Sequence, residues 1–351
     1  MNVGFIGTGK IFDLHILGYL ENNEVEIAAL CDIDQNKAEM KAKKFKLRNS
    51  VNIYSDFKEM MKQENLDLIE ILLPPTLNAE VTHHIARMGI KAISINPPIA
   101  PSLDKTDQII QRCKENNIIL SVYESYYFAP HIQKAKKLIE TDYIGDPTSI
   151  RIKTAIGSNN GWNIQDEEKE KGFLNLLDIG WHSFALPRLF FKEKIKKVFG
   201  WSSEYKGLKV PAYVMFEFEQ TEKHPVPQYG NLEFSLLPEM KLPSNYYPVD
   251  EFIEIIGTQG LMKINQGISI GNAMTDSDVF APLIIVRDGK VESYNEFPKD
   301  LKYSFIKATE HFINTAKGKK RPLLDGETAK SILKFNLAAI QSSQKEKEIY
   351  L

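Results

Sequence analysis

Two glycines close to the start of the chain have the spacing of a phosphate-binding turn. An apolar stretch, Val3–Ile6, runs into the sequence GTGKIF at residues 7–12. A first glycine permits a tight turn, and a second lets backbone N–H groups approach a pyrophosphate at the start of the next helix. The usual third glycine, which gives close helix–strand packing, is replaced by Phe12. Two glycines are common at strand–helix turns, so this motif needs support from a second feature.

An acidic residue supplies that feature. The stretch Val25–Cys31 ends at Asp32, a little over twenty residues beyond the glycines, where dinucleotide-binding proteins hold the ribose hydroxyls. The Asp32 carboxylate can accept from both hydroxyls and would repel a 2′-phosphate, and no Arg or Lys immediately follows it. The sequence therefore favours NAD over NADP. The alternative interpretation is an acid on a solvent-exposed turn.

A parallel sheet is the element that would bring these residues together. Over the first 125 or so residues, apolar strand patterns alternate with helix patterns, which predicts a parallel sheet covered on both faces. Such a sheet binds ligands at the carboxyl ends of its strands. The expected strands are Val3–Ile6, Val25–Cys31, Leu68–Leu73, Ala92–Ile95 and Ile118–Val122, and the expected helices include Asn36–Phe45, Leu77–Met88 and Leu103–Asn116.

Composition bounds the class of protein. With 351 residues, 43% of them hydrophobic and 26% charged, the chain predicts about two soluble domains. The net charge of -2 gives no basic footprint for nucleic acid, and no stretch is long and apolar enough to span a membrane. Two cysteines, Cys31 and Cys113, are too few for a disulfide framework. With no leader pattern at MNVGFIGTG, we expect a cytoplasmic protein.

Three later segments complete a family resemblance. They read GFLNLLDIGWHS at 172–183, EIIGTQGLMKI at 254–264 and KGKKRPLLDGETAKSILKFNLAAIQSS at 317–343. In this order, behind the N-terminal pattern, the chain resembles the glucose–fructose oxidoreductase / inositol dehydrogenase / MocA (Gfo/Idh/MocA) family over almost its whole length. The resemblance implies an NAD(P)-dependent enzyme that oxidises or reduces a hydroxyl carbon of a sugar, cyclitol or related polyol.

The resemblance also implies the fold class and the domains. It is α/β, with an N-terminal Rossmann domain at residues 1–125. A C-terminal α+β domain at 126–351 carries a large, mostly antiparallel open sheet, and its last helices pack back toward the first domain. Family members pair as dimers or tetramers through that sheet, so we expect a homodimer or homotetramer. Strand patterns fit at 148–155, 197–201, 212–217, 230–236, 252–256, 262–264 and 283–286, helices fit at 303–317 and 326–344, and residues 286–291 read as a hairpin turn.

The resemblance places the catalytic pair at Asp178 and His182. Their spacing of four puts both on one face of a helix. A neutral His182 can take the proton of a carbinol, and Asp178 can orient the substrate or the imidazole. The alternative is a purely structural pair on a packed helix.

Where the family has Glu-Lys-Pro after the fifth strand, this chain has Asn96-Pro97-Pro98. Pro97 therefore occupies the position of the catalytic lysine, whose ammonium would stabilise a developing alkoxide. Leu73-Pro74-Pro75-Thr76 replaces the family's Thr-Pro-Asn-His, and Ser125 and Tyr127 replace an Asn and an Arg. The adenosine end of the cofactor site is kept, and the nicotinamide and substrate end is rewritten.

The predicted site residues form three sets. The cofactor set is Gly7, Thr8, Gly9, Lys10, Ile11, Asp32, Leu73, Pro74 and Asn96. The substrate set is Tyr123, Glu124, Tyr127 and Trp162, and the catalytic set is His182 and Asp178. No spacing suits a metal.

Three functions remain open on the sequence. The first is an NAD-linked oxidoreductase in which another acid–base group replaces the lysine. The second is a catalytically silent NAD-binding partner or regulatory subunit. The third is a non-redox enzyme on the same scaffold, because a fold does not dictate its chemistry.

Overall fold

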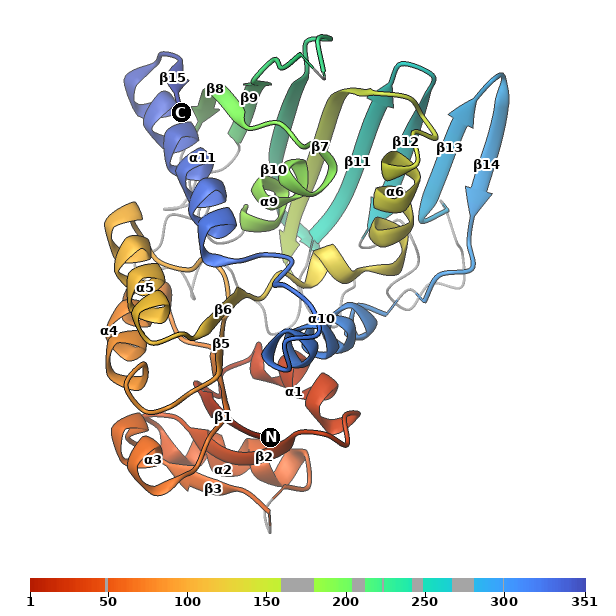
Figure 1. The fold of residues 1–351 in the computed structure, drawn as a ribbon. Coiled ribbons are helices and arrows are strands. Elements are labelled where there is room, and N and C mark those ends of the chain that lie inside the picture. Colours follow the sequence, from red (N-terminus) through yellow and green to blue (C-terminus); the bar gives the residue numbers. More distant parts are fainter. Residues whose placement is uncertain are drawn as a thin grey trace. The chain divides into compact units, whose positions relative to one another are not determined.

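The computed structural model describes residues 1–47, 50–158, 180–203, 212–222, 224–241, 249–266, 281–298 and 300–351 (Figure 1). The chain divides into two compact units. The first contains Met1–Phe128 and Lys302–Leu333, and the second contains Ala129–Leu301 and Lys334–Leu351. The predicted boundary lay at residue 125, and in the structure a C-terminal segment belongs to the first unit as well.

The first unit is built on a six-stranded sheet in the order β3-β2-β1-β4-β5-β6. All its strand pairs are parallel, as the buried apolar runs predicted. The order reverses between β1 and β4, which is where such sheets bind ligands. The strands are β1 (Asn2–Ile6), β2 (Glu26–Cys31), β3 (Asn52–Tyr54), β4 (Leu68–Ile71), β5 (Ala92–Ile95) and β6 (Ile119–Val122). The sequence missed β3, which is three residues long and not fully buried.

Helices cover this sheet (Figure 1). They are α1 (Phe12–Leu20), α2 (Gln35–Lys44), α3 (Phe57–Gln63), α4 (Pro75–Ile85), α5 (Leu103–Glu115), the 3₁₀ turn η1 (Ser125–Phe128) and α10 (Lys302–Ala316). Helices α1, α2 and α10 share one apolar core with strands β1 and β2. Asp34, Asp56 and Ser102 cap α2, α3 and α5 by accepting backbone N–H bonds, which fixes where each helix begins.

The second unit is built on a nine-stranded sheet in the order β14-β13-β12-β11-β7-β10-β9-β8-β15. Among the described strands only β7 and β10 pair in parallel, so the predicted, mostly antiparallel sheet is confirmed. Its strands are β7 (Pro147–Ser158), β8 (Ile195–Ser202), β9 (Ala212–Phe218), β10 (Tyr229–Lys241), β11 (Val249–Gly257), β12 (Gly260–Gln266), β13 (Leu283–Arg287), β14 (Lys290–Tyr294) and β15 (Ile349–Tyr350). The predicted hairpin turn is present, with positive φ at Asp288 and Gly289.

The two faces of this sheet differ. Helices α6 (Pro130–Glu140), α9 (Trp181–Phe190) and the second half of α11 (Gly326–Lys345) belong to this unit. Phe184 of α9 packs on Phe234 and Phe335, and Phe335 also packs on Phe216. These rings bury one face of the sheet. On the other face, side chains of alternate residues stay exposed, and they include Trp201, Met215, Tyr229 and Ile256.

No helix in the described part of the chain has the length and apolar character needed to cross a membrane. Cys31 and Cys113 are both buried free thiols, and burial raises the pKa of each to about 12.

Candidate functional site

The first glycine turn is built by backbone geometry that glycine alone accommodates. Gly7 follows β1 with φ of +99°, and its N–H donates to the Cys31 carbonyl at 2.8 Å. A Cβ placed on Gly7 would lie 2.5 Å from the Leu72 carbonyl oxygen. Any other residue would therefore strain the backbone and collide with the neighbouring strand's end.

The second glycine faces open space. A Cβ on Gly9 would meet no heavy atom within 4 Å. Lys10 beside it is exposed, and Ile11 caps α1 without a side-chain hydrogen bond. An open backbone at the start of a helix is the cradle that a phosphate group requires, because a side chain would fill it.

Asp32 is locked to this turn. Its Oδ2 accepts from the Thr8 N–H and from the Thr8 hydroxyl, both at 2.8 Å, and its Oδ1 accepts from the Asp34 N–H at 3.0 Å. The glycine turn and the acid after β2, which the sequence placed together on spacing alone, are thus directly hydrogen-bonded. Ile33, the next residue, is 93% exposed.

The other predicted cofactor residues follow β4, which pairs with β1 on the side away from β2, and β5, which pairs with β4. Leu73 lies against the glycine turn, with its Cδ2 3.2 Å from the Cβ position of Gly7. Pro74 precedes α4 and is half-buried. Asn96 follows β5, and its N–H donates to the Ile71 carbonyl at 3.0 Å. The carboxyl ends of β1, β2, β4 and β5 therefore carry the whole predicted cofactor set.

The end of β5 presents no ionisable side chain. The Asn96 amide donates to the Pro97 carbonyl at 3.2 Å, the peptide between Pro97 and Pro98 is cis, and both prolines are buried. Ile99, further on, accepts from Asn78 of α4 at 3.0 Å. This stretch cannot exchange a proton with a substrate.

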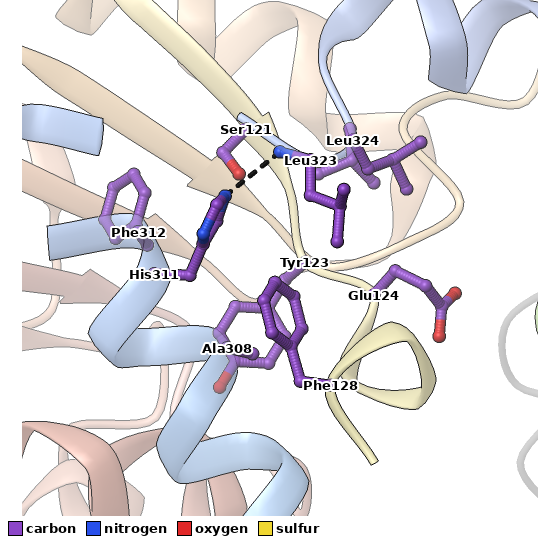
Figure 2. Close-up of a pocket in the computed structure, with 10 residues that line it drawn as sticks. Ser121, Tyr123, Glu124, Phe128, Ala308, His311, Phe312, Leu323 and Leu324 are labelled. Atoms are coloured by element: carbon purple, nitrogen blue, oxygen red, sulfur yellow. Dashed lines mark hydrogen bonds between the residues drawn. The ribbon is translucent and has the colours of Figure 1, made fainter. Parts of the chain in front are cut away.

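A small pocket lies at the end of β6, between that strand, α10 and residues 323–324 (Figure 2). The Leu323 N–H donates to His311 Nε2 at 3.1 Å, so the imidazole is neutral with its proton on Nδ1. Burial and the nearby Lys320 lower the pKa of His311. The Leu324 carbonyl accepts from the Val122 N–H at 2.9 Å, so the 323–325 segment lines the edge of the sheet.

The predicted substrate residues on the first unit are all buried. The Tyr123 hydroxyl donates to the Phe305 carbonyl at 2.6 Å and lies 2.9 Å from Thr309 Oγ1, which commits it to the core. Glu124 accepts from the Tyr126 N–H at 3.1 Å, and its carboxylate points away from His311 in Figure 2. Tyr127 is 2% exposed.

Sequence reasoning missed a buried polar cluster beneath α1. Glu70, in the middle of β4, accepts from the Tyr19 hydroxyl at 2.6 Å and lies 3.3 Å from His15 Nδ1. The His15 ring contacts the Tyr123 ring in a tilted arrangement, with centroids 3.9 Å apart and an interplanar angle of 35°. Burial and the Glu70 charge raise the pKa of Tyr19 well above its ordinary value. One signal existed: an acid inside the otherwise apolar run of Leu68–Leu73.

The predicted catalytic pair is described only in part. His182 lies half-buried in the first turn of α9, while Asp178 and Trp162 fall outside the described residues. The next residue, Ser183, is fully buried and shares a network with two groups of the sheet: its hydroxyl lies 3.0 Å from Thr154 Oγ1 and donates to Glu251 Oε1 at 3.2 Å. This network anchors the start of the helix that carries His182. The described residues contain no cluster that could hold a metal ion.

A parallel sheet whose first turn is tied to an acid after the second strand defines a dinucleotide-binding Rossmann protein. Family models agree. Residues 1–124 match the oxidoreductase family with an NAD-binding Rossmann fold, and residues 132–263 match the GFO/IDH/MocA C-terminal domain. The chain belongs to the Gfo/Idh/MocA oxidoreductase family.

Individual relatives are distant. An uncharacterised oxidoreductase of Bacillus subtilis, YrbE, is 26% identical over 196 residues, which are 56% of this chain and 55% of that protein. A D-apiose dehydrogenase of Paraburkholderia graminis is 25% identical over 147 residues, 42% of this chain and 38% of that protein. The alignments thus cover less than two thirds of these relatives' own length.

Among solved structures, the fold matches an oxidoreductase from Agrobacterium radiobacter in complex with NAD⁺, L-tartaric acid and magnesium. The TM-score is 0.80 at 15% identity, over 100% of this chain and 98% of that one. At this identity the likeness concerns the fold.

Proposed function

We propose that this protein is an NAD-dependent oxidoreductase that acts on a hydroxyl or keto carbon of a sugar, cyclitol or related polyol derivative. The observation that carries the proposal is the direct hydrogen bonding of Thr8, in the glycine turn, to Asp32. This contact joins the turn that we expect to bind phosphate to the acid that we expect to bind ribose, at the ends of β1 and β2. The order of the sheet reverses beside them, between β1 and β4, where such sheets bind ligands.

The residues present fit NAD. The open backbone at Gly9 leaves room for the pyrophosphate, and Asp32 Oδ1 has acceptor capacity for a ribose hydroxyl. Ile33 offers apolar surface beside that acid for the adenine. Asp32 opposes a 2′-phosphate, and two lysines of α2, Lys41 and Lys44, are paired with Asp13. We therefore expect NAD to bind more tightly than NADP.

The sugar-like substrate class rests on family membership and on relatives such as the D-apiose dehydrogenase. When bound, NAD would supply the hydride acceptor for the carbinol carbon. The hydroxyl proton must then go to a protein group. Pro97 has no side-chain group that can accept a proton. His182 is therefore the proposed proton acceptor, and Asp178 is proposed to orient the substrate or the imidazole. Glu124, Tyr127 and Trp162 remain proposed substrate contacts, and Tyr123 is left out because the core occupies its hydroxyl.

A second candidate function is a catalytically silent NAD-binding partner subunit. The Asn96-Pro97-Pro98 stretch, with both prolines buried, favours it, because the strand end where the family carries its lysine offers no charge to stabilise an alkoxide.

We also propose that a second copy of this chain covers the exposed face of the nine-stranded sheet. Trp201, Met215, Tyr229 and Ile256 lie on that face among cross-strand ion pairs such as Lys153–Glu233. Apolar groups interspersed with paired charges suit a self-complementary interface. Light scattering should report a dimer or tetramer, and Met215→Lys should reduce the oligomer; a wild-type monomer at high micromolar concentration contradicts this.

Two measurements test the function. The first is titration of the purified protein with NADH and NADPH, followed by fluorescence. Tighter NADH binding that is lost in Asp32→Ala supports the cofactor assignment, and equal affinity for the two removes it. The second is a panel of sugars, sugar acids, cyclitols and their keto forms, followed at the NADH absorbance band. Turnover of any member supports the enzyme, whereas stoichiometric NAD binding without turnover favours the partner subunit.

A further inference from the structure

The Asp32 carboxylate accepts more hydrogen bonds from the protein than a ribose-binding aspartate requires. A single aspartate after β2 can accept from ribose hydroxyls without help. Here three donors already fix the carboxylate: two from Thr8 on Oδ2 and the Asp34 N–H on Oδ1. Thr8 is 1% exposed, so its hydroxyl does not exchange this bond with water.

The distribution of the bonds determines which oxygen stays available. A carboxylate oxygen has two lone pairs. The Thr8 N–H and hydroxyl use both of those on Oδ2, and the Asp34 N–H uses one on Oδ1. The remaining acceptor position therefore lies on Oδ1, and the direction in which it points is set by the bonds that hold Oδ2.

The two Thr8 donors have different origins. The backbone N–H belongs to the turn itself, which the Gly7 geometry and the bond from the Gly7 N–H to the Cys31 carbonyl hold in place. The hydroxyl is a side-chain donor, and it reaches the same oxygen of Asp32 as the backbone N–H. Without it, the carboxylate keeps one bond on each oxygen and gains freedom to rotate.

We propose that Thr8 is a positioning residue for cofactor choice: its hydroxyl holds the Asp32 carboxylate where it accepts from the adenosine ribose of NAD and opposes the 2′-phosphate of NADP. This inference rests on the proposed NAD-binding function. A rotated carboxylate binds the ribose diol less well and stands less directly against a 2′-phosphate, so the hydroxyl acts on both affinities in opposite directions.

The test compares four proteins: wild type, Thr8→Val, Thr8→Ser and Asp32→Ala. Valine keeps the branched shape and the backbone N–H but removes the hydroxyl, while serine keeps the hydroxyl and removes a methyl group. Dissociation constants for NADH and NADPH are measured by calorimetry, and the NADH preference is their ratio. We expect Thr8→Val to lower this preference about tenfold, the range for one hydrogen bond to a charged group, and Thr8→Ser to restore it to within about threefold.

The outcomes distinguish failure of the Thr8 role from failure of the proposed NAD-binding function. Wild-type preference in Thr8→Val, together with lost preference in Asp32→Ala, overturns the role of Thr8 and leaves NAD binding through Asp32 intact. Equal weakening of both cofactors by Thr8→Val, with a lowered melting temperature, shows a merely structural role and also overturns it. If Asp32→Ala keeps the wild-type preference, both proposals fall. Should Thr8→Val not fold, Thr8→Ala replaces it against the same Thr8→Ser reference.

Discussion

Strands β2 and β5 of the same parallel sheet differ in the residues that follow their carboxyl ends. After β2, a carboxylate is fixed by three hydrogen bonds to the glycine turn and its own helix cap. After β5, an amide and two buried prolines follow, and the Asn96 amide bonds only to the adjacent Pro97 carbonyl among its described contacts. Both strands are short and end in a run of buried residues. The comparison teaches that the sheet provides the positions and the first residues beyond each strand provide the chemistry.

The difference also distinguishes what cofactor binding requires from what the reaction requires. We expect binding of the adenosine end to depend on backbone N–H groups of the glycine turn and on one acid, Asp32. The family resemblance implies that the reaction end depends on an ionisable group after β5, where this chain has Asn96-Pro97-Pro98. A protein can therefore keep the cofactor while altering or losing the reaction, and the following experiments decide how far the separation goes.

The largest expected effect concerns His182. If the altered end still performs hydride chemistry, His182→Asn should lower turnover roughly a hundred- to ten-thousand-fold, because asparagine lacks a titratable nitrogen. NADH affinity should stay within about threefold of wild type, which steady-state kinetics and titration together would establish. His84→Asn, on the exposed surface of α4, is the matched control. Unchanged turnover in His182→Asn moves the acid–base role to another residue.

Alanine substitutions at the two glycines of the turn should have different effects, one on stability and the other on cofactor affinity. Gly7→Ala forces a positive φ on alanine and a collision with the Leu72 carbonyl, so it should destabilise the apoprotein by about 2–4 kcal/mol. Gly9→Ala meets open space, so the apoprotein melting temperature should stay within about 2 °C while NADH affinity falls about tenfold or more. Thermal unfolding and titration of both variants measure this. Full cofactor affinity in Gly9→Ala would mean that the pyrophosphate does not lie there.

A lysine introduced at position 97, where the family resemblance places one, should raise turnover only slightly. Pro97→Lys introduces an ammonium but leaves Leu73, Ser125 and Tyr127 as they are, so the gain in turnover on common sugars and inositols should stay below about tenfold. Pro97→Ala controls for loss of the ring. A large gain from the lysine alone would show that the rest of the reaction end is intact and that the comparison reduces to one residue.

The smallest expected effect is the pH dependence of stability that His311 contributes in the pocket at the end of β6. His311 is held neutral with a pKa below its usual value of about 6.5, first by burial and then by Lys320. The folded state therefore binds fewer protons than the unfolded state, and the stability from this group is present above pH 6.5 and lost as the pH falls below it. Denaturant unfolding at several pH values should show a loss of about 1 kcal/mol from the Leu323 bond. His311→Gln, which can still accept from Leu323, should flatten that part of the profile, whereas exposed His84→Gln should leave it unchanged.

Much of the fold followed from the sequence. The runs Val3–Ile6, Ala92–Ile95 and Leu283–Val286 are apolar and bounded by turn residues, so their strands were predicted almost to the residue. Short elements escaped: β3 has only three residues, and β15 has two, which pair with β8 at the end of the chain. Such short strands form because the edge of a sheet lies beside them. Their existence therefore depends on the three-dimensional structure and not on a local sequence pattern.

For the site, the sequence by itself determined the residue types: two glycines, an acid at the right distance and a strand end without an ionisable group. Local rules are enough for these, since φ, charge and proton-carrying ability belong to single residues. Only the tertiary structure decided that Thr8 binds Asp32 and that Tyr123 belongs to the core beside His15. It also showed that Glu70 is buried with a tyrosine and a histidine. Those facts depend on which side chains meet across strands and helices far apart in the chain, and no pattern within one segment specifies the partner of a buried polar atom.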